Sequence, residues 1–119
     1  MKTPRLGACL CIFCISILVS CSNDNEEELF GSLNFQCDPA VVTFSDVIKP
    51  IINTNCTVSG CHVIGTGLPD YTQFSVIQAL ASEIKERTAI RDMPRGGRTL
   101  TSLEIAQIAC WVDNGAQNN

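Results

Sequence analysis

The sequence has few basic residues, no long apolar run and no internal repeat. Its 119 residues include eight lysines and arginines against 12 aspartates and glutamates. Nucleic-acid binding needs basic side chains that contact phosphates, so the composition argues against that class of function. The apolar run from Leu6 to Val19 is too short to span a bilayer comfortably. No alternating strand of useful length is present, and the length suits one domain.

The N-terminal segment has the pattern of a secretory signal peptide. Lys2 and Arg5 precede the short apolar run, and this order is typical of export signals. The run ends in Leu18-Val19-Ser20-Cys21, which resembles the lipobox of bacterial lipoproteins. The resemblance implies a signal peptide at residues 1–20 that is removed, and a diacylglycerol attached to Cys21. The alternative for the run is a buried N-terminal helix.

Residues 21–36 are predicted to form a lipidated, acidic tether. Ser22 follows the cysteine, which resembles outer-membrane sorting, and the acidic stretch from Asp24 to Glu28 resembles a signal for export to the cell surface. A solvated tether explains the same acidic residues. Without residues 1–20, six basic residues face 12 acidic ones, a net charge of −6. We therefore expect a lipid-anchored protein of the outer membrane that faces the periplasm or the cell surface.

Residues 37–119 are predicted to form an all-α domain. A helix is expected from an N-cap at Ser45 to Asn53, with a distorted first turn or a late start caused by Pro50. Apolar spacing predicts a second helical stretch over roughly Tyr71 to Arg87. A third helix is predicted to begin with a capping box formed by Thr101 and Glu104, and to end near Gly115. An irregular loop, residues 92–98, separates the last two.

The segment Cys56-Thr57-Val58-Ser59-Gly60-Cys61-His62 carries the clearest chemistry. Covalent haem attachment needs two thiols that add to the vinyl groups, and a histidine beside the second thiol that lies under the iron. The common motif has two residues between the cysteines, whereas this one has four. The additional residues must loop outward, and Ser59-Gly60 supplies the freedom to do so.

The sequence has one histidine, and one methionine once Met1 is removed. His62 and Met93 are then the single pair that could supply the two axial ligands of a six-coordinate haem. Met93 lies in the loop Arg91-Asp92-Met93-Pro94-Arg95-Gly96-Gly97, where a side chain can be presented to a pocket. The alternative for Met93 is a core residue that fills a gap.

Four segments together resemble a known family. They are Ser45 to Ile51, Cys56 to His62, Met93-Pro94 and Ile108 to Ala116. The pattern is similar to the single-haem cytochrome c domains of bacterial envelope proteins, over about residues 37–119. The resemblance implies thioether bonds at Cys56 and Cys61, a proximal ligand His62, a distal ligand Met93, and Trp111 packed near the haem. The longer cysteine spacing is the one departure from the family pattern.

Four arginines surround Met93 in an otherwise acidic protein, namely Arg87, Arg91, Arg95 and Arg98. Arg95 or Arg98 is expected to lie near a haem propionate. The arginines could instead form a basic collar that docks an acidic redox partner, or simply a solvated loop. The implied function is electron transfer by one covalent haem c, in exchange with a redox partner protein. Two axial ligands leave no open iron position, so an enzyme is not expected.

Other readings of the cysteine cluster stay open. Cys56 and Cys61 could form a short structural disulfide, which is the default in exported proteins. They could bind zinc with His62 and a third cysteine, or act as a Cys/His nucleophile pair. The alternative function is a haem-free, disulfide-stapled surface lipoprotein that serves as a binding or accessory module.

Cys37 and Cys110 are the two cysteines that the haem reading leaves over. The cytochrome c resemblance implies that the first and last helices of the domain meet. A Cys37–Cys110 disulfide is therefore expected in an oxidising compartment. The alternative is a pair of buried thiols.

Overall fold

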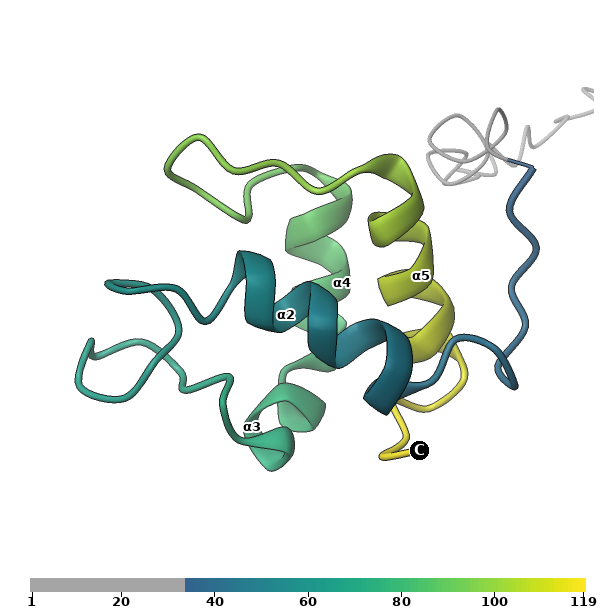
Figure 1. Ribbon diagram of the computed structural model, residues 1–119, viewed down its shortest axis with the longest axis horizontal. Coiled ribbons are helices and arrows are strands. Elements are labelled where there is room, and N and C mark those ends of the chain that lie inside the picture. Colours follow the sequence, from purple (N-terminus) through teal and green to yellow (C-terminus); the bar gives the residue numbers. More distant parts are fainter. Residues whose placement is uncertain (1–33) are drawn as a thin grey trace, which may run out of the picture.

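The computed structural model describes residues 34–119, so the predicted signal peptide, the predicted lipidation site Cys21 and most of the predicted tether lie outside the described residues. Every regular element in this range is a helix, and the predicted all-α class is confirmed at that level. None of these helices is both long and apolar enough to cross a bilayer. The elements are a π-helical turn η1 (Phe44–Ile48), α2 (Lys49–Asn55), α3 (Phe74–Ala79), α4 (Ala81–Ala89) and α5 (Ser102–Asp113) (Figure 1).

The first helical segment begins earlier than the predicted N-cap at Ser45, which was wrong. Thr43 has the extended backbone of an N-cap, and its hydroxyl accepts from the backbone N–H of Asp46 at 3.3 Å. The N–H of Ser45 instead donates to the carbonyl of Asn119 at 2.9 Å. The α-helical part starts only at Lys49, which leaves Pro50 in its first turn, where the missing N–H costs little.

The single helical stretch predicted over Tyr71 to Arg87 is two helices. The chain breaks at Leu80, which ends α3 and precedes α4. Ile77 on one side of the break and Ala81 and Ile84 on the other are all buried. The break allows both short helices to turn their apolar residues inward, and apolar spacing alone does not reveal it.

The last helix forms as the sequence predicted. Thr101 Oγ1 accepts from the N–H of Glu104 at 3.2 Å, and Glu104 Oε2 accepts from the N–H of Thr101 at 2.7 Å. The capping box is therefore confirmed. Gly115 follows the helix with φ of +93°, a conformation that glycine adopts without a steric penalty.

The core is built on the buried face of α5. Ile105 and Ile108 of α5 and Ile48 and Ile52 of the first helical segment are almost completely buried. Helix α5 packs against both α4 and η1. The ring of Phe44 in η1 lies 5.7 Å, centroid to centroid, from the indole of Trp111. This packing brings the first and last helical elements of the described residues together.

Two loops extend from one side of this core (Figure 1). We call residues 56–73, between α2 and α3, the cysteine loop, and residues 90–101, between α4 and α5, the methionine loop. The first follows α2 and the second follows α4. Residues far apart in the sequence are therefore carried to the same side of the molecule.

Cys37 and Cys110 form a disulfide in the structure. Their Cα atoms lie 5.5 Å apart, and 73 positions of sequence separate them. Cys37 is exposed in the segment before η1, whereas Cys110 is buried in α5. The bond therefore ties the start of the domain to its last helix.

Loss of this disulfide should destabilise the fold. Cys37→Ser removes the exposed partner and leaves the core unchanged, and a cross-link over 73 positions is worth up to about 4 kcal/mol on the chain-entropy model. Denaturant unfolding should show a lower midpoint for the variant than for the parent protein. Reductant should shift the parent to the midpoint of the variant and leave the variant unchanged. Two alkylatable thiols from Cys37 and Cys110 in the unfolded, unreduced parent would contradict the assignment.

Candidate functional site

A cavity of about 340 Å³ opens between the cysteine loop and the methionine loop. This volume lies in the range of small-molecule and cofactor sites. Helix α4 supplies one wall, and the two loops supply most of the rest. The lining residues are Asn55, Cys56, Gly60, Cys61, His62, Leu68, Pro69, Tyr71, Glu83, Ile84, Arg87, Met93, Pro94 and Arg95.

Five residues singled out from the sequence meet at this cavity. Cys56, Cys61 and His62 come from the cysteine loop, and Met93 and Arg95 come from the methionine loop. At least 31 positions of sequence separate the two groups. The cavity therefore unites two thiols, an imidazole, a thioether and a guanidinium.

Arg98 and Trp111 do not line this cavity. Arg98 lies at a separate hollow of about 20 Å³ that also touches Met93 and Pro94. Trp111 is 2% exposed in the core, with its ring against Phe44 and its N–H donating to the carbonyl of Gln117 at 2.9 Å. Its hydrogen bond and ring contact hold Trp111 in the helix packing, and its place beside a cofactor stays a prediction.

The cysteine loop closes on itself despite the four residues between its thiols. The N–H of His62 donates to the carbonyl of Cys56 at 3.1 Å, and the N–H of Cys61 donates to the carbonyl of Val58 at 2.9 Å. Gly60 has φ of +81°, which a residue with a side chain rarely adopts. The intervening Ser59 and Gly60 are exposed. The additional residues thus lie on the outside of the loop.

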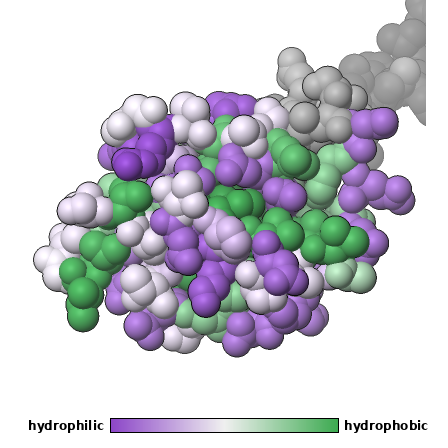
Figure 2. Space-filling model, in the orientation of Figure 1, coloured by the Kyte–Doolittle hydropathy of each residue, from purple (hydrophilic) through white to green (hydrophobic). Residues whose placement is uncertain are grey.

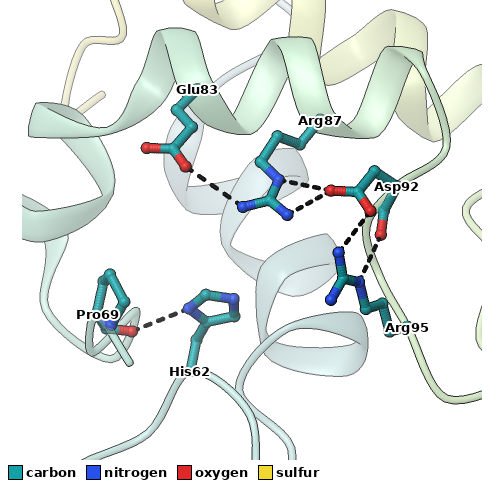
Figure 3. Close-up of polar contacts among 6 residues, drawn as sticks. All are labelled: His62, Pro69, Glu83, Arg87, Asp92 and Arg95. Atoms are coloured by element: carbon teal, nitrogen blue, oxygen red, sulfur yellow. Dashed lines mark hydrogen bonds and ion pairs between the residues drawn. The ribbon is translucent and has the colours of Figure 1, made fainter. Parts of the chain in front are cut away.

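The imidazole of His62 is held on two sides. Its Nδ1 lies 3.1 Å from the carbonyl oxygen of Pro69 (Figure 3). A carbonyl can only accept, so Nδ1 carries a proton in this contact, and in the neutral imidazole Nε2 then keeps its lone pair. The phenol ring of Tyr71 stacks on the imidazole, with centroids 4.1 Å apart and planes within 4°. His62 is therefore oriented with one nitrogen prepared to bind a metal.

Burial changes the acidity of the groups beside His62. Desolvation raises the pKa of the Cys56 thiol to about 11, and the charge of Cys61 adds to the effect. Burial also raises the pKa of the Tyr71 hydroxyl, with smaller contributions from Glu83 and Cys56. Cys56 is therefore a neutral thiol at physiological pH. A buried, neutral thiol is a poor nucleophile, which disfavours the Cys/His catalytic reading.

The geometry also bears on the two other hypotheses for Cys56 and Cys61, a short structural disulfide and a zinc site. Cys56 and Cys61 are free thiols in the structure, so the short disulfide between them is not formed. Cys37 and Cys110 are bonded to each other, so neither can supply the third thiolate of a zinc site. Across residues 34–119 no group of three or more His, Cys, Asp and Glu side chains has the geometry to hold a metal ion.

The opposite wall of the cavity is charged. Arg87 of α4 donates to Asp92 through Nε at 2.9 Å and through Nη2, and its Nη1 lies 3.5 Å from Glu83 Oε1. Arg95 Nη2 donates to Asp92 Oδ1 at 2.7 Å. Hydrogen bonds from Arg95 and Arg87 hold the pKa of Asp92 below its usual range. These four residues lie across a gap from His62 in Figure 3.

Sequence reasoning gave no site role to Pro69, Tyr71 or Glu83, which line the cavity, and it counted Arg87 only among the arginines around Met93. Glu83 and Arg87 are four positions apart on one helix, a spacing that predicts an ion pair but not a site. Pro69 acts through its backbone carbonyl, which leaves no signal in the residue type. Tyr71 was placed in a helix by its spacing, whereas it lies in the turn before α3.

Comparisons with protein-family models, with curated proteins and with solved structures found no match for this chain.

The tautomer of His62 tests this geometry without any cofactor. In the haem-free protein, at a pH where the imidazole is neutral, its nitrogen chemical shifts should report a protonated Nδ1 and an unprotonated Nε2. Tyr71→Phe keeps the stacked ring and should keep this tautomer. Tyr71→Leu removes the stack and should give a mixture of the two tautomers. A protonated Nε2 in the parent protein would contradict the hydrogen bond to Pro69.

Proposed function

We propose that this protein is a lipid-anchored, monohaem c-type cytochrome that carries electrons in the bacterial cell envelope. One observation carries the proposal. Two free thiols, an imidazole with an available Nε2 and a thioether, from two separate loops, line one cavity. These are the donors that a covalent haem with His/Met ligation requires.

The residues at the cavity fit such a group. Cys56 and Cys61 would hold the haem through thioether bonds, and His62 and Met93 would be its axial ligands. When bound, the haem supplies a one-electron couple, and a thioether ligand raises its reduction potential. With both axial positions filled by side chains, the proposal is an electron carrier and not an enzyme.

The chain itself would orient the ligands and limit access of water. Pro69 and Tyr71 fix the plane of the His62 ring, and Ile84 and Leu68 contribute apolar lining. The raised pKa of Cys56 reflects the low polarity around the attachment site. A protected, apolar environment disfavours the ferric, more highly charged state and so favours a higher potential.

The surface near the cavity suggests how a redox partner protein would dock. Residues 50–69 contain no Asp, Glu, Lys or Arg, and Ile64 and Leu68 are 86% and 47% exposed. Figure 2 shows apolar atoms protruding where Figure 1 has the cysteine loop. The methionine loop adds the exposed Arg95 and Arg98. An apolar contact flanked by basic side chains suits a partner with an acidic rim.

Covalent attachment is the first test of the proposal. Protein from a host with haem maturation machinery should keep a peroxidase-active haem stain after denaturing electrophoresis. Replacing both thiols, Cys56→Ala with Cys61→Ala, should abolish the stain, since no thioether can form. Cys37→Ser, which removes a cysteine away from the cavity, should retain it.

A colourless parent protein from such a host would overturn the proposal. It would favour the haem-free lipoprotein, in which the Cys37–Cys110 bond staples a binding or accessory module. Retention of the stain by the double variant would instead show that another residue anchors the haem.

A further inference from the structure

The methionine loop is attached to α4 through both the backbone and the side chain of Arg87. The carbonyl of Arg87 accepts from the N–H groups of Asp92 at 3.0 Å and Met93 at 3.2 Å. Its guanidinium donates to Asp92 Oδ2 through Nε at 2.9 Å and also through Nη2. One residue of the helix thus holds the same stretch of loop from two directions.

Asp92 is held from the loop side as well. Arg95 donates to Asp92 Oδ1 at 2.7 Å, and the Nε of Arg95 lies 3.4 Å from the backbone carbonyl of Asp92. Glu83, one helical turn before Arg87, lies 3.5 Å from the Arg87 guanidinium. Figure 3 shows this chain of contacts. We call Glu83, Arg87, Asp92 and Arg95 the Asp92 brace, because both carboxylate oxygens of Asp92 are engaged.

The far end of the loop is attached too. Arg91 donates to the carbonyl of Leu100 and to the hydroxyl of Ser102, each at 3.2 Å. The loop contains two glycines and an unbranched methionine, whose side chain has three rotatable bonds. Ordering such a segment costs conformational entropy. Fixing its backbone in advance lowers the cost of presenting the thioether at one place.

We infer that the Asp92 brace is a positioning device that holds Met93 at the cavity as an iron ligand. The inference rests on the proposed function. Asp92 itself does not line the cavity, whereas Met93, Glu83, Arg87 and Arg95 do. Asp92 directly precedes Met93, so the contacts that hold Asp92 to Arg87 also hold the backbone of Met93. The side chains of Arg87 and Asp92 are 34% and 33% exposed, so the contacts are partly shielded from water.

The test measures how readily an added ligand displaces Met93. In the haem-loaded protein, imidazole competes with the thioether for iron, and loss of the sulfur-to-iron charge-transfer band reports the exchange. Asp92→Asn removes the charge that Arg87 and Arg95 share, and should raise the apparent affinity for imidazole about three- to fivefold, as expected for a partly exposed ion-pair network. Met93→Ala gives the reference for complete loss of the band.

Matched variants separate the brace from general charge effects. Glu86→Gln makes the same charge change at an exposed site on α4 and should leave the imidazole affinity unchanged. Arg87→Gln removes one of the two partners of Asp92 and should also raise the imidazole affinity. The double variant should raise it by less than the two single effects combined, because both variants disrupt the same Arg87–Asp92 contact. Equal effects from Asp92→Asn and Glu86→Gln would overturn the inference.

Two further outcomes decide between a positioning role and a merely structural one. A lower midpoint of unfolding with unchanged imidazole affinity in Asp92→Asn would overturn the inference. Amide hydrogen exchange at Asp92 and Met93 gives a readout that needs no haem, and it should be faster in Asp92→Asn and unchanged in Glu86→Gln. If the parent binds no haem, the proposed function fails on that ground alone. Unchanged amide hydrogen exchange in Asp92→Asn would then reject the positioning role of the Asp92 brace independently.

Discussion

The buried face of α5 is the constraint on which both loops of the cavity depend. Ile105 and Ile108 on this face are almost completely buried, and α5 packs against α4 and η1. The cysteine loop follows α2, which continues from η1, and the methionine loop follows α4. The packing of α5 therefore determines where both loops begin, and the Cys37–Cys110 bond strengthens the same contact.

Each proposed iron ligand is positioned by partners that do not themselves bind iron. The carbonyl of Pro69 and the ring of Tyr71 orient His62, and Arg87 holds the backbone before and at Met93. Such supporting contacts set the tautomer and geometry of metal ligands in general. The two sides of the cavity differ in character, since the cysteine loop is uncharged up to Pro69 and the opposite wall carries an ion-pair network.

Local signals in the sequence predicted the parts of the fold that local interactions determine. The capping box at the start of α5 needs only Thr101 and Glu104, and it formed as expected. The N-cap of the first helical segment is Thr43 rather than Ser45, and the N–H groups of residues 44 and 45 donate to Asn119, a contact between distant segments. The break at Leu80 likewise depends on how two short helices share one core.

The same distinction applies to the candidate site. Residue type and spacing identified Cys56, Cys61, His62 and Met93, since thiols, imidazoles and thioethers are chemically distinctive and the chain has only one histidine and two methionines. Pro69 was not identifiable because a backbone carbonyl has no residue signature. Arg95 lines the cavity, but its pairing with Asp92 and the contacts of Arg87 depend on the folding of the loop. Trp111 was assigned to the cofactor from a resemblance, and the structure shows it in the helix core.

The most direct test of the central claim is mass spectrometry of the peptide that contains Cys56 and Cys61. The protein should be purified without reductant from a host with haem maturation machinery. Addition of two thiols across two vinyl groups loses no atoms, so this peptide should be heavier than its sequence by the mass of one haem. A peptide lighter by two hydrogens would instead contain a Cys56–Cys61 disulfide, and it would contradict the haem site.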